Sequence, residues 1–344
     1  MISKKYNTIL VKEEVTSLYN IINSIIKVKN GSIISLGFFN YLILLTIEIS
    51  DYINNNYSAN INVKYKSKLK ECRARIKPYQ LEISDIFTKI NKLNIETMDN
   101  YTKNLSKITK VLFPNLITNL GIFKYNDKII ANTFLIAKDL KPIIYKDNNP
   151  DKDKIIEISS VVGELLKNLT SLFNNNVFKT NVINLKEKFT SKDYNVLKKC
   201  NKLFAKEIDI NTSLFLLDIL SIINFCNEII YKFNISESLK YRILYIAYYR
   251  TYHNLNIIFA VNISELNNLK LIHSKYDVLN NRIFRNAMFH YDFTDKIDES
   301  ELDETELYFG LIKKYFKINQ FEYKNLIKNY FNDVSSIIQN IIFN

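Results

Sequence analysis

The sequence has no tryptophan, and among its 344 residues only five are glycine, four are proline and three are cysteine. Folds rich in β-sheet and tight turns need more glycine and proline, so this scarcity favours long helices. Cys72, Cys200 and Cys226 are far apart and form no CxxC pair. This spacing supports neither a zinc ribbon nor a disulfide framework, and reduced thiols fit the cytosol. We therefore expect a cytoplasmic protein.

Targeting signals and the common catalytic motifs are also missing. The N-terminus lacks the apolar core and the small-residue cleavage site of a signal peptide. Two long apolar stretches, 31–47 and 214–230, are shorter than a clean membrane span of about 20 residues or contain polar residues, so we predict buried helices and no membrane. No serine-hydrolase elbow, Walker loop, dinucleotide fingerprint or HExxH motif occurs, and we expect neither a cofactor nor a metal.

Positive charge is plentiful and unevenly distributed. The net charge is +12 at pH 7. Residues 1–200 contain 31 Lys and Arg against 18 Asp and Glu, whereas residues 201–344 contain 16 against 17. A basic region attracts polyanions, of which nucleic acid is the commonest in a cell. The alternative is a solvated basic face of a lysine-rich chain.

The chain is predicted to be mainly α-helical, with 47% hydrophobic residues to build a core. In the first half, Asn126-Asp127 between short apolar runs suits a small β-hairpin within 121–145, and 145–154 is a polar linker. We divide the chain into a basic, mostly helical recognition or regulatory region, a helical connector and a helical bundle, at 1–150, 151–195 and 196–344. Helices are expected at 11–27, 33–53, 81–113 and 155–173.

In the last part of the chain, apolar spacing becomes regular and the connections are short, which predicts an antiparallel helical bundle. An acidic stretch, 292–306, interrupts it. The expected helices are 211–232, 236–261, 264–291, 301–317 and 321–343.

One helical segment, 281–291, gathers chemically active side chains. At 100° per residue, Arg282, Arg285, Asn286 and His290 lie on one face, with Phe289 as the one apolar residue among them. Arg285 and His290 would be separated by about 7.5 Å along the helix axis. Both side chains would then reach a single phosphodiester.

This pairing suits RNA cleavage without a metal. The 2′-hydroxyl must lose a proton and the leaving 5′-oxygen must gain one, and histidine serves either step near neutral pH. Arg285 can hold the phosphorane oxygens through two hydrogen bonds, and Asn286 can position a reacting group. The reaction would leave a 2′,3′-cyclic phosphate and spare DNA.

The segment Arg285-Asn286-Ala287-Met288-Phe289-His290 resembles the Arg-polar-x-x-x-His signature of the HEPN superfamily, with Asn in the common second place. The resemblance covers about the last 145 residues. It implies a helical bundle that dimerises into a composite active site. It also implies metal-independent endoribonuclease activity in a toxin–antitoxin, abortive-infection or CRISPR-associated antiviral defence setting. One toxin subgroup has a regulatory Tyr two residues after the His, where this chain has Asp292.

Further residues are assigned around this motif. Arg250 and Glu237 share a predicted helix and would line the cleft as supporting groups. A basic segment at 64–77 could hold the RNA backbone, present a solvated helix edge or bind an acidic antitoxin. With Arg282, its candidate RNA-binding residues are Lys64, Lys66, Lys68, Lys70, Arg73, Arg75 and Lys77.

The remaining histidines, His253 and His273, are expected to be ordinary surface or core residues. The tyrosines spaced along 245–252 predict a packing or dimer face. The alternative to the nuclease is a non-catalytic HEPN-fold module that dimerises and binds RNA or protein. A nucleotide-binding regulator using the same cleft is a third hypothesis.

Overall fold

The structure is a computed structural model. It describes residues 2–57, 61, 66–76, 92, 95–96, 106, 118–146, 149–150, 152–173, 183, 185, 188–196, 201–261, 263–291 and 309–343. The predicted helix at 81–113 lies almost wholly outside the described residues, as does the acidic stretch 292–306.

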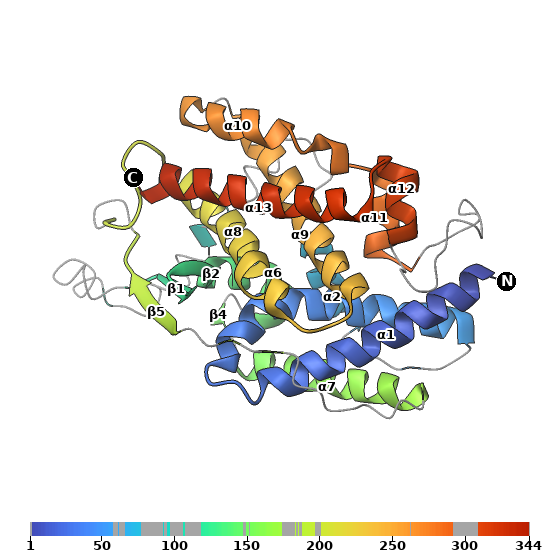
Figure 1. Ribbon diagram of the computed structural model, residues 1–344. Helices are drawn as coiled ribbons and strands as arrows, with labels where there is room; N and C mark the ends of the chain where they lie inside the picture. Colours follow the sequence, from blue (N-terminus) through green and yellow to red (C-terminus); the bar gives the residue numbers. More distant parts are fainter. Residues whose placement is uncertain are drawn as a thin grey trace.

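Helices dominate the described residues, and the predicted mainly α-helical character is confirmed (Figure 1). The first half of the chain also contributes a small sheet. Its elements are α1 (Ile2–Ile25), α2 (Gly31–Tyr57), α3 (Lys66–Ile76), β1 (Leu120–Tyr125), β2 (Lys128–Asn132), α6 (Thr133–Ile144), β3 (Tyr145–Lys146), β4 (Asn149–Pro150), α7 (Lys152–Leu172) and β5 (Phe189–Tyr194).

The second half is helical, and most of its helices match the predicted ranges. The elements are α8 (Ile210–Glu228), η2 (Ile230–Lys232), α9 (Glu237–Phe259), η3 (Ser264–Leu266), α10 (Asn267–Ser274), η4 (Asp277–Leu279), α11 (Arg282–Phe289), α12 (Phe309–Phe316) and α13 (Gln320–Phe343). Asp209 and Ser236 begin α8 and α9 as N-caps, because their side chains accept hydrogen bonds from backbone N–H groups of the first turn.

The predicted hairpin is confirmed. Asn126 and Asp127 have φ values of 49° and 59°, the left-handed pair that a two-residue type I′ turn requires. β5 pairs with the other edge of β1, so the antiparallel order is β2–β1–β5. The mostly polar, exposed sequence of β5 gave no strand signal. Helix α8 packs across β2 (Figure 1).

The two apolar stretches form the central helices α2 and α8. By length and composition, Gly31–Tyr57 and Ile210–Lys232 could each cross a membrane. However, 72% and 89% of their most apolar windows are buried inside the protein. One hydrophobic core runs from α1 to α13, so the regions predicted as 1–150 and 196–344 share their interior.

The prediction of one helix over 264–291 was wrong. The chain leaves the helix after Ser274 and re-enters it at Arg282. Two tyrosine hydroxyls of α9 hold this break: Tyr248 donates to the carbonyl of Tyr276 at 2.8 Å, and Tyr245 to that of Leu279 at 3.1 Å. Helical periodicity does not reveal such contacts, because they come from a distant part of the chain. The predicted packing role of these tyrosines is confirmed, since both are fully buried.

Candidate functional site

Helix α11 carries the predicted motif, and it begins at an N-cap. Asn281 Oδ1 accepts hydrogen bonds from the backbone N–H groups two and three residues later, at 2.9 and 3.0 Å. Phe284 and Met288 turn into the core. Phe289 was placed among the polar residues by its helical angle, yet it is buried, with its ring 5.8 Å from that of Tyr249.

His290 does not continue the helix, contrary to the prediction. Its backbone is extended, with φ −131° and ψ 157°, and it forms the C-cap of α11. Its N–H still donates to the carbonyl of Asn286 at 2.9 Å, so Asn286 anchors the residue through the backbone. The imidazole therefore leaves the face that Arg285 occupies, because the chain straightens before it.

The imidazole of His290 contacts a carboxylate from the first quarter of the chain. Nδ1 lies 2.8 Å from Oε2 of Glu48, a residue of α2. The other carboxylate oxygen of Glu48 accepts from Nη1 of Arg73 in α3, at 2.7 Å. The Glu48 side chain is 7% exposed and that of His290 is 34% exposed. The shielded carboxylate of Glu48 thus bridges the imidazole of His290, at the surface, and the guanidinium of Arg73.

Arg285 has a different environment. Its guanidinium lies 5.3 Å from the centroid of the Tyr249 ring, a cation–π contact with α9. The ring of His253 is 4.2 Å from the same tyrosine, and His253 Nε2 is 3.1 Å from Asn280 Oδ1. Burial lowers the pKa of His253; the Asn280 bond opposes this shift, and the Arg285 charge adds to it. The contacts that place Arg285 and His290 therefore come from different helices, α9 and α2.

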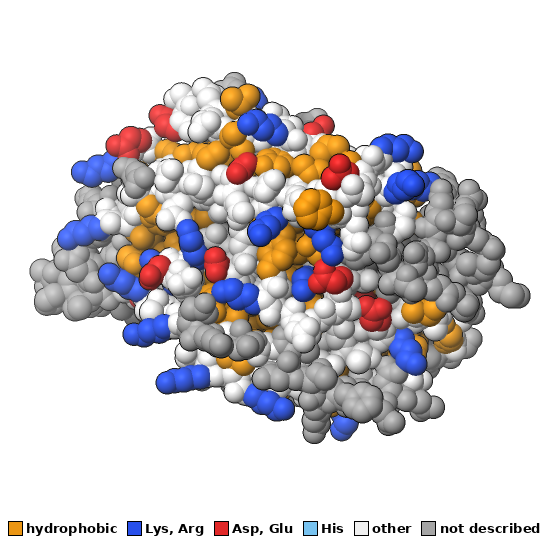
Figure 2. Space-filling model, in the orientation of Figure 1, with side chains coloured by type: hydrophobic (Ala, Val, Ile, Leu, Met, Phe, Trp, Pro, Cys, Tyr) orange, Lys and Arg blue, Asp and Glu red, His pale blue; other side chains and the backbone are white. Residues whose placement is uncertain are grey.

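Many cations of the predicted basic segment lie on α3, where they pair with acids of α2. Lys66 and Lys70 both reach Asp51, at 2.8 and 2.9 Å. Arg75 donates to the carbonyl of Lys138 at 3.3 Å. Lys68 is exposed, as is Arg282 at the start of α11, whereas Lys64 and Lys77 lie outside the described residues. On the face in Figure 2, Lys and Arg side chains are scattered among acidic ones and form no continuous stripe.

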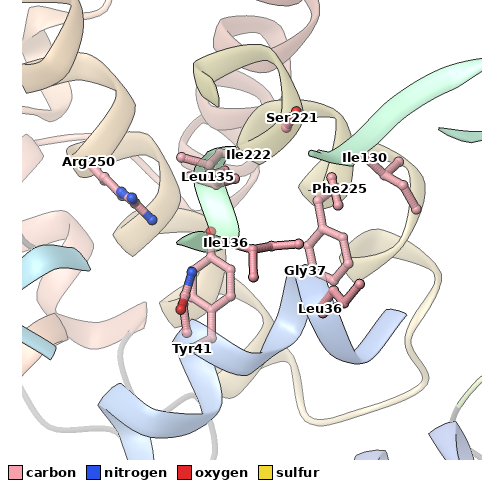
Figure 3. A pocket seen from close by; sticks show the side chains of 12 residues that line it. Leu36, Gly37, Tyr41, Ile130, Leu135, Ile136, Ser221, Ile222, Phe225 and Arg250 are labelled. Atoms are coloured by element: carbon pink, nitrogen blue, oxygen red, sulfur yellow. The ribbon is translucent and has the colours of Figure 1, made fainter. Parts of the chain in front are cut away.

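The predicted supporting residues Arg250 and Glu237 lie elsewhere. Arg250 is buried, and its Nη2 donates to Asp139 at 2.6 Å. It lines an internal cavity with Tyr41 and Ser221 (Figure 3). Glu237 lies at the surface, where its carboxylate oxygens accept from Lys240 at 2.9 Å and from Lys324 at 2.8 Å. Among the described residues, neither binds Glu48, the carboxylate that contacts His290.

Glu48 is the functional candidate that the sequence interpretation missed. It is the first charged residue of α2 and directly follows the uncharged run at 31–47. A carboxylate in such a place needs a partner, because burying an unpaired charge is very costly. That requirement was a readable signal for a polar site on α2. The identity of the partner, 242 residues away, was not readable.

His273 is a buried histidine with a lowered pKa. It is 2% exposed and stacks on Tyr252 at 4.0 Å, and burial lowers its pKa to about 4. The folded protein therefore keeps this imidazole neutral, while the unfolded chain protonates it near pH 6.5. Stability from this group is present above pH 6.5 and is lost as the pH falls towards 4.

We therefore expect acidification from pH 7 to 4.5 to lower the free energy of unfolding of the wild type by about 2 kcal/mol relative to that of His273→Phe. Urea unfolding of both proteins at the two pH values measures this. An unchanged difference would show that His273 titrates normally and is not enclosed.

Among the described residues, no group of three or more His, Cys, Asp or Glu side chains is placed to hold a metal ion. Cys72 and Cys226 are both buried free thiols. Comparison with known proteins shows no match to a family model, a curated protein or a solved structure.

Proposed function

We propose that this protein is a metal-independent endoribonuclease of HEPN type in which His290 moves the proton and Glu48 orients it. One observation carries the proposal: a partly exposed imidazole whose Nδ1 is 2.8 Å from a shielded carboxylate. The Arg-x4-His resemblance supplies the reaction class. The structure adds the carboxylate and the guanidinium of Arg73 behind it.

The contact with Glu48 sets the tautomer of the neutral imidazole. A carboxylate that accepts Nδ1–H leaves Nε2 as the proton acceptor. In the proposed reaction Nε2 removes the proton of a 2′-hydroxyl, and the 2′-oxygen attacks phosphorus. The bond from phosphorus to the 5′-oxygen breaks, and that oxygen leaves with a proton from a second acid. In a homodimer, the His290 of a second copy would be that acid.

The arginines have separate proposed tasks. Arg285 and Arg282 are on α11 and would bind the phosphate oxygens, where charge develops in the transition state. Arg73 donates to Glu48 and so helps to fix the position of its carboxylate beside His290. Asn286 anchors His290 through its carbonyl. The cations of α3 would add backbone affinity where Asp51 and Glu48 do not neutralise them.

The proposed setting is a cytoplasmic defence or toxin–antitoxin system, with a regulatory protein or antitoxin as partner. It follows from the resemblance alone. A second candidate function is a non-catalytic HEPN-fold module that binds RNA or protein. It is favoured by the different environments of Arg285 and His290, one against Tyr249 and the other against Glu48.

The proposal is tested by incubating the purified protein with tRNA and mRNA in EDTA. We expect fragments that end in 2′,3′-cyclic phosphates, because no metal or water is needed to break the bond. A matched oligonucleotide with one 2′-deoxyribose at the cleavage position should resist cutting there, since it lacks the nucleophile. Cleavage that requires Mg²⁺, or that proceeds at the deoxy position, would contradict the mechanism. RNA binding without cleavage would favour the non-catalytic module.

A further inference from the structure

A second pocket lies beneath the β-hairpin, at the opposite end of the molecule from α11. In Figure 1 the hairpin and the C-terminus are on the left and α11 is on the right. The pocket has a volume of about 110 Å³ and is bounded by β1, β2, the end of β5, α8 and the end of α13. Its apolar lining is Ile122, Ile129, Leu203, Leu220 and Phe343.

Polar side chains of different kinds also line the pocket, among them Asn224, Lys124, Asp127 and Gln339. Asn224 is 3% exposed, and its Nδ2 has no hydrogen-bond partner within the described residues. A buried donor without a partner costs about 1–3 kcal/mol, so an acceptor brought by a ligand would remove that cost. Lys124 and Asp127 also line the pocket. The type I′ turn fixes the backbone of Asp127, so its position is set before a ligand arrives.

Lys124 and Asp127 carry opposite charges but do not satisfy each other. Within the part of the chain that the structure describes, neither forms an ion pair, although they are three residues apart on one hairpin. A pocket with one cation, one anion and an apolar floor is complementary to a molecule with the reverse pattern. Such a molecule is neutral overall, with an anionic end, a cationic end and an apolar tail.

We propose that this pocket binds a free α-amino acid with an aliphatic side chain. The carboxylate would accept from Lys124 Nζ and from Asn224 Nδ2. The ammonium would donate to Asp127, and the side chain would cover Leu220 and Phe343.

Size and charge argue against larger anions. A cavity of about 150 Å³ holds a benzene molecule, so 110 Å³ suits a branched aliphatic side chain. A nucleotide would place at least two negative charges beside a single lysine and one aspartate. The ligand would join the hairpin, α8 and α13, three elements that belong to different parts of the chain. This inference does not depend on the ribonuclease proposal, because its test measures binding alone.

The test is calorimetric titration of the full chain with L-leucine and L-valine, alongside two analogues that each lack one charge. Isocaproate lacks the ammonium and isoamylamine lacks the carboxylate. We expect at least one amino acid to bind and both analogues to bind at least about tenfold more weakly, since each loses a charge-assisted hydrogen bond. Equal binding of an analogue, or no binding of either amino acid, would overturn the proposal.

Variants identify the pocket. Lys124→Met and Asp127→Asn should each weaken amino-acid binding at least about tenfold. Asn tolerates the left-handed turn, so the second change should leave the hairpin intact. Lys128→Met is the matched control, because Lys128 is exposed on the same hairpin and does not line the pocket. If Lys128→Met weakens binding as much as Lys124→Met, the ligand binds elsewhere and the assignment fails.

Discussion

Replacing Glu14 with alanine is expected to lower the free energy of unfolding by about 3–5 kcal/mol. The Glu14 carboxylate is fully buried in α1 and pairs with Arg242 of α9, which is also fully buried. The same carboxylate oxygen accepts from the hydroxyl of Tyr291. Without Glu14 a guanidinium charge would remain inside the core without the carboxylate that pairs with it. Denaturation followed by circular dichroism measures the loss.

Arg242 also contacts the residues on either side of His290. Its Nε donates to the carbonyl of Met288 at 2.7 Å, and its guanidinium lies 4.4 Å from the centroid of the Tyr291 ring. These contacts fix the chain before and after His290. The ion pair therefore holds α1 against the end of α11, and its loss should also disturb the position of His290.

Two controls separate the charge effect from a simple loss of packing. Lys12→Ala removes an exposed side chain of the same helix and should change stability by less than about 0.5 kcal/mol. The double change Glu14→Leu with Arg242→Met replaces both charges with apolar groups and should recover much of the lost stability. If Glu14→Ala alone costs less than about 1 kcal/mol, the pair is not buried as described.

Local sequence patterns predicted the elements whose signals are themselves local. The hairpin followed from Asn126-Asp127, and α13 from apolar spacing over 321–343. The break between Ser274 and Arg282 was missed because it depends on tyrosine hydroxyls of α9 that bind backbone carbonyls. Periodicity measures which face of a segment is apolar, and such cross-chain hydrogen bonds leave no trace in it.

The candidate site was predicted in part for the same reason. The motif identified His290 and Arg285 from their spacing, but the spacing assumed one continuous helix. Because the helix ends at Phe289, the imidazole turns towards α2 instead of standing above Arg285. Its partner Glu48 comes from a region interpreted as separate, and only the shared core brings the two together.

The largest expected effect on activity comes from His290→Ala, which should slow RNA cleavage by about 10²–10⁴-fold, the usual contribution of a general acid–base group. Glu48→Gln should slow it by at least about tenfold, because an amide can donate to Nδ1 and so favour the opposite tautomer. Single-turnover rates on one RNA, measured from pH 5 to 9, test both. Glu48 acts as a positioning residue, so its loss should also change the shape of the pH–rate profile.

The matched control is Asp51→Asn on the same helix, three residues after Glu48. It makes the same change of charge, but Asp51 binds Lys66 and Lys70, whereas Glu48 contacts the imidazole. It should keep the wild-type pH profile and at most bind RNA more tightly at low salt, because Lys66 and Lys70 lose the acid that neutralises them. Melting curves of all variants establish that they are folded. A folded His290→Ala protein that cleaves at the wild-type rate would show that His290 takes no part in the reaction. The contact with Glu48 would then serve only to hold α2 against the end of α11.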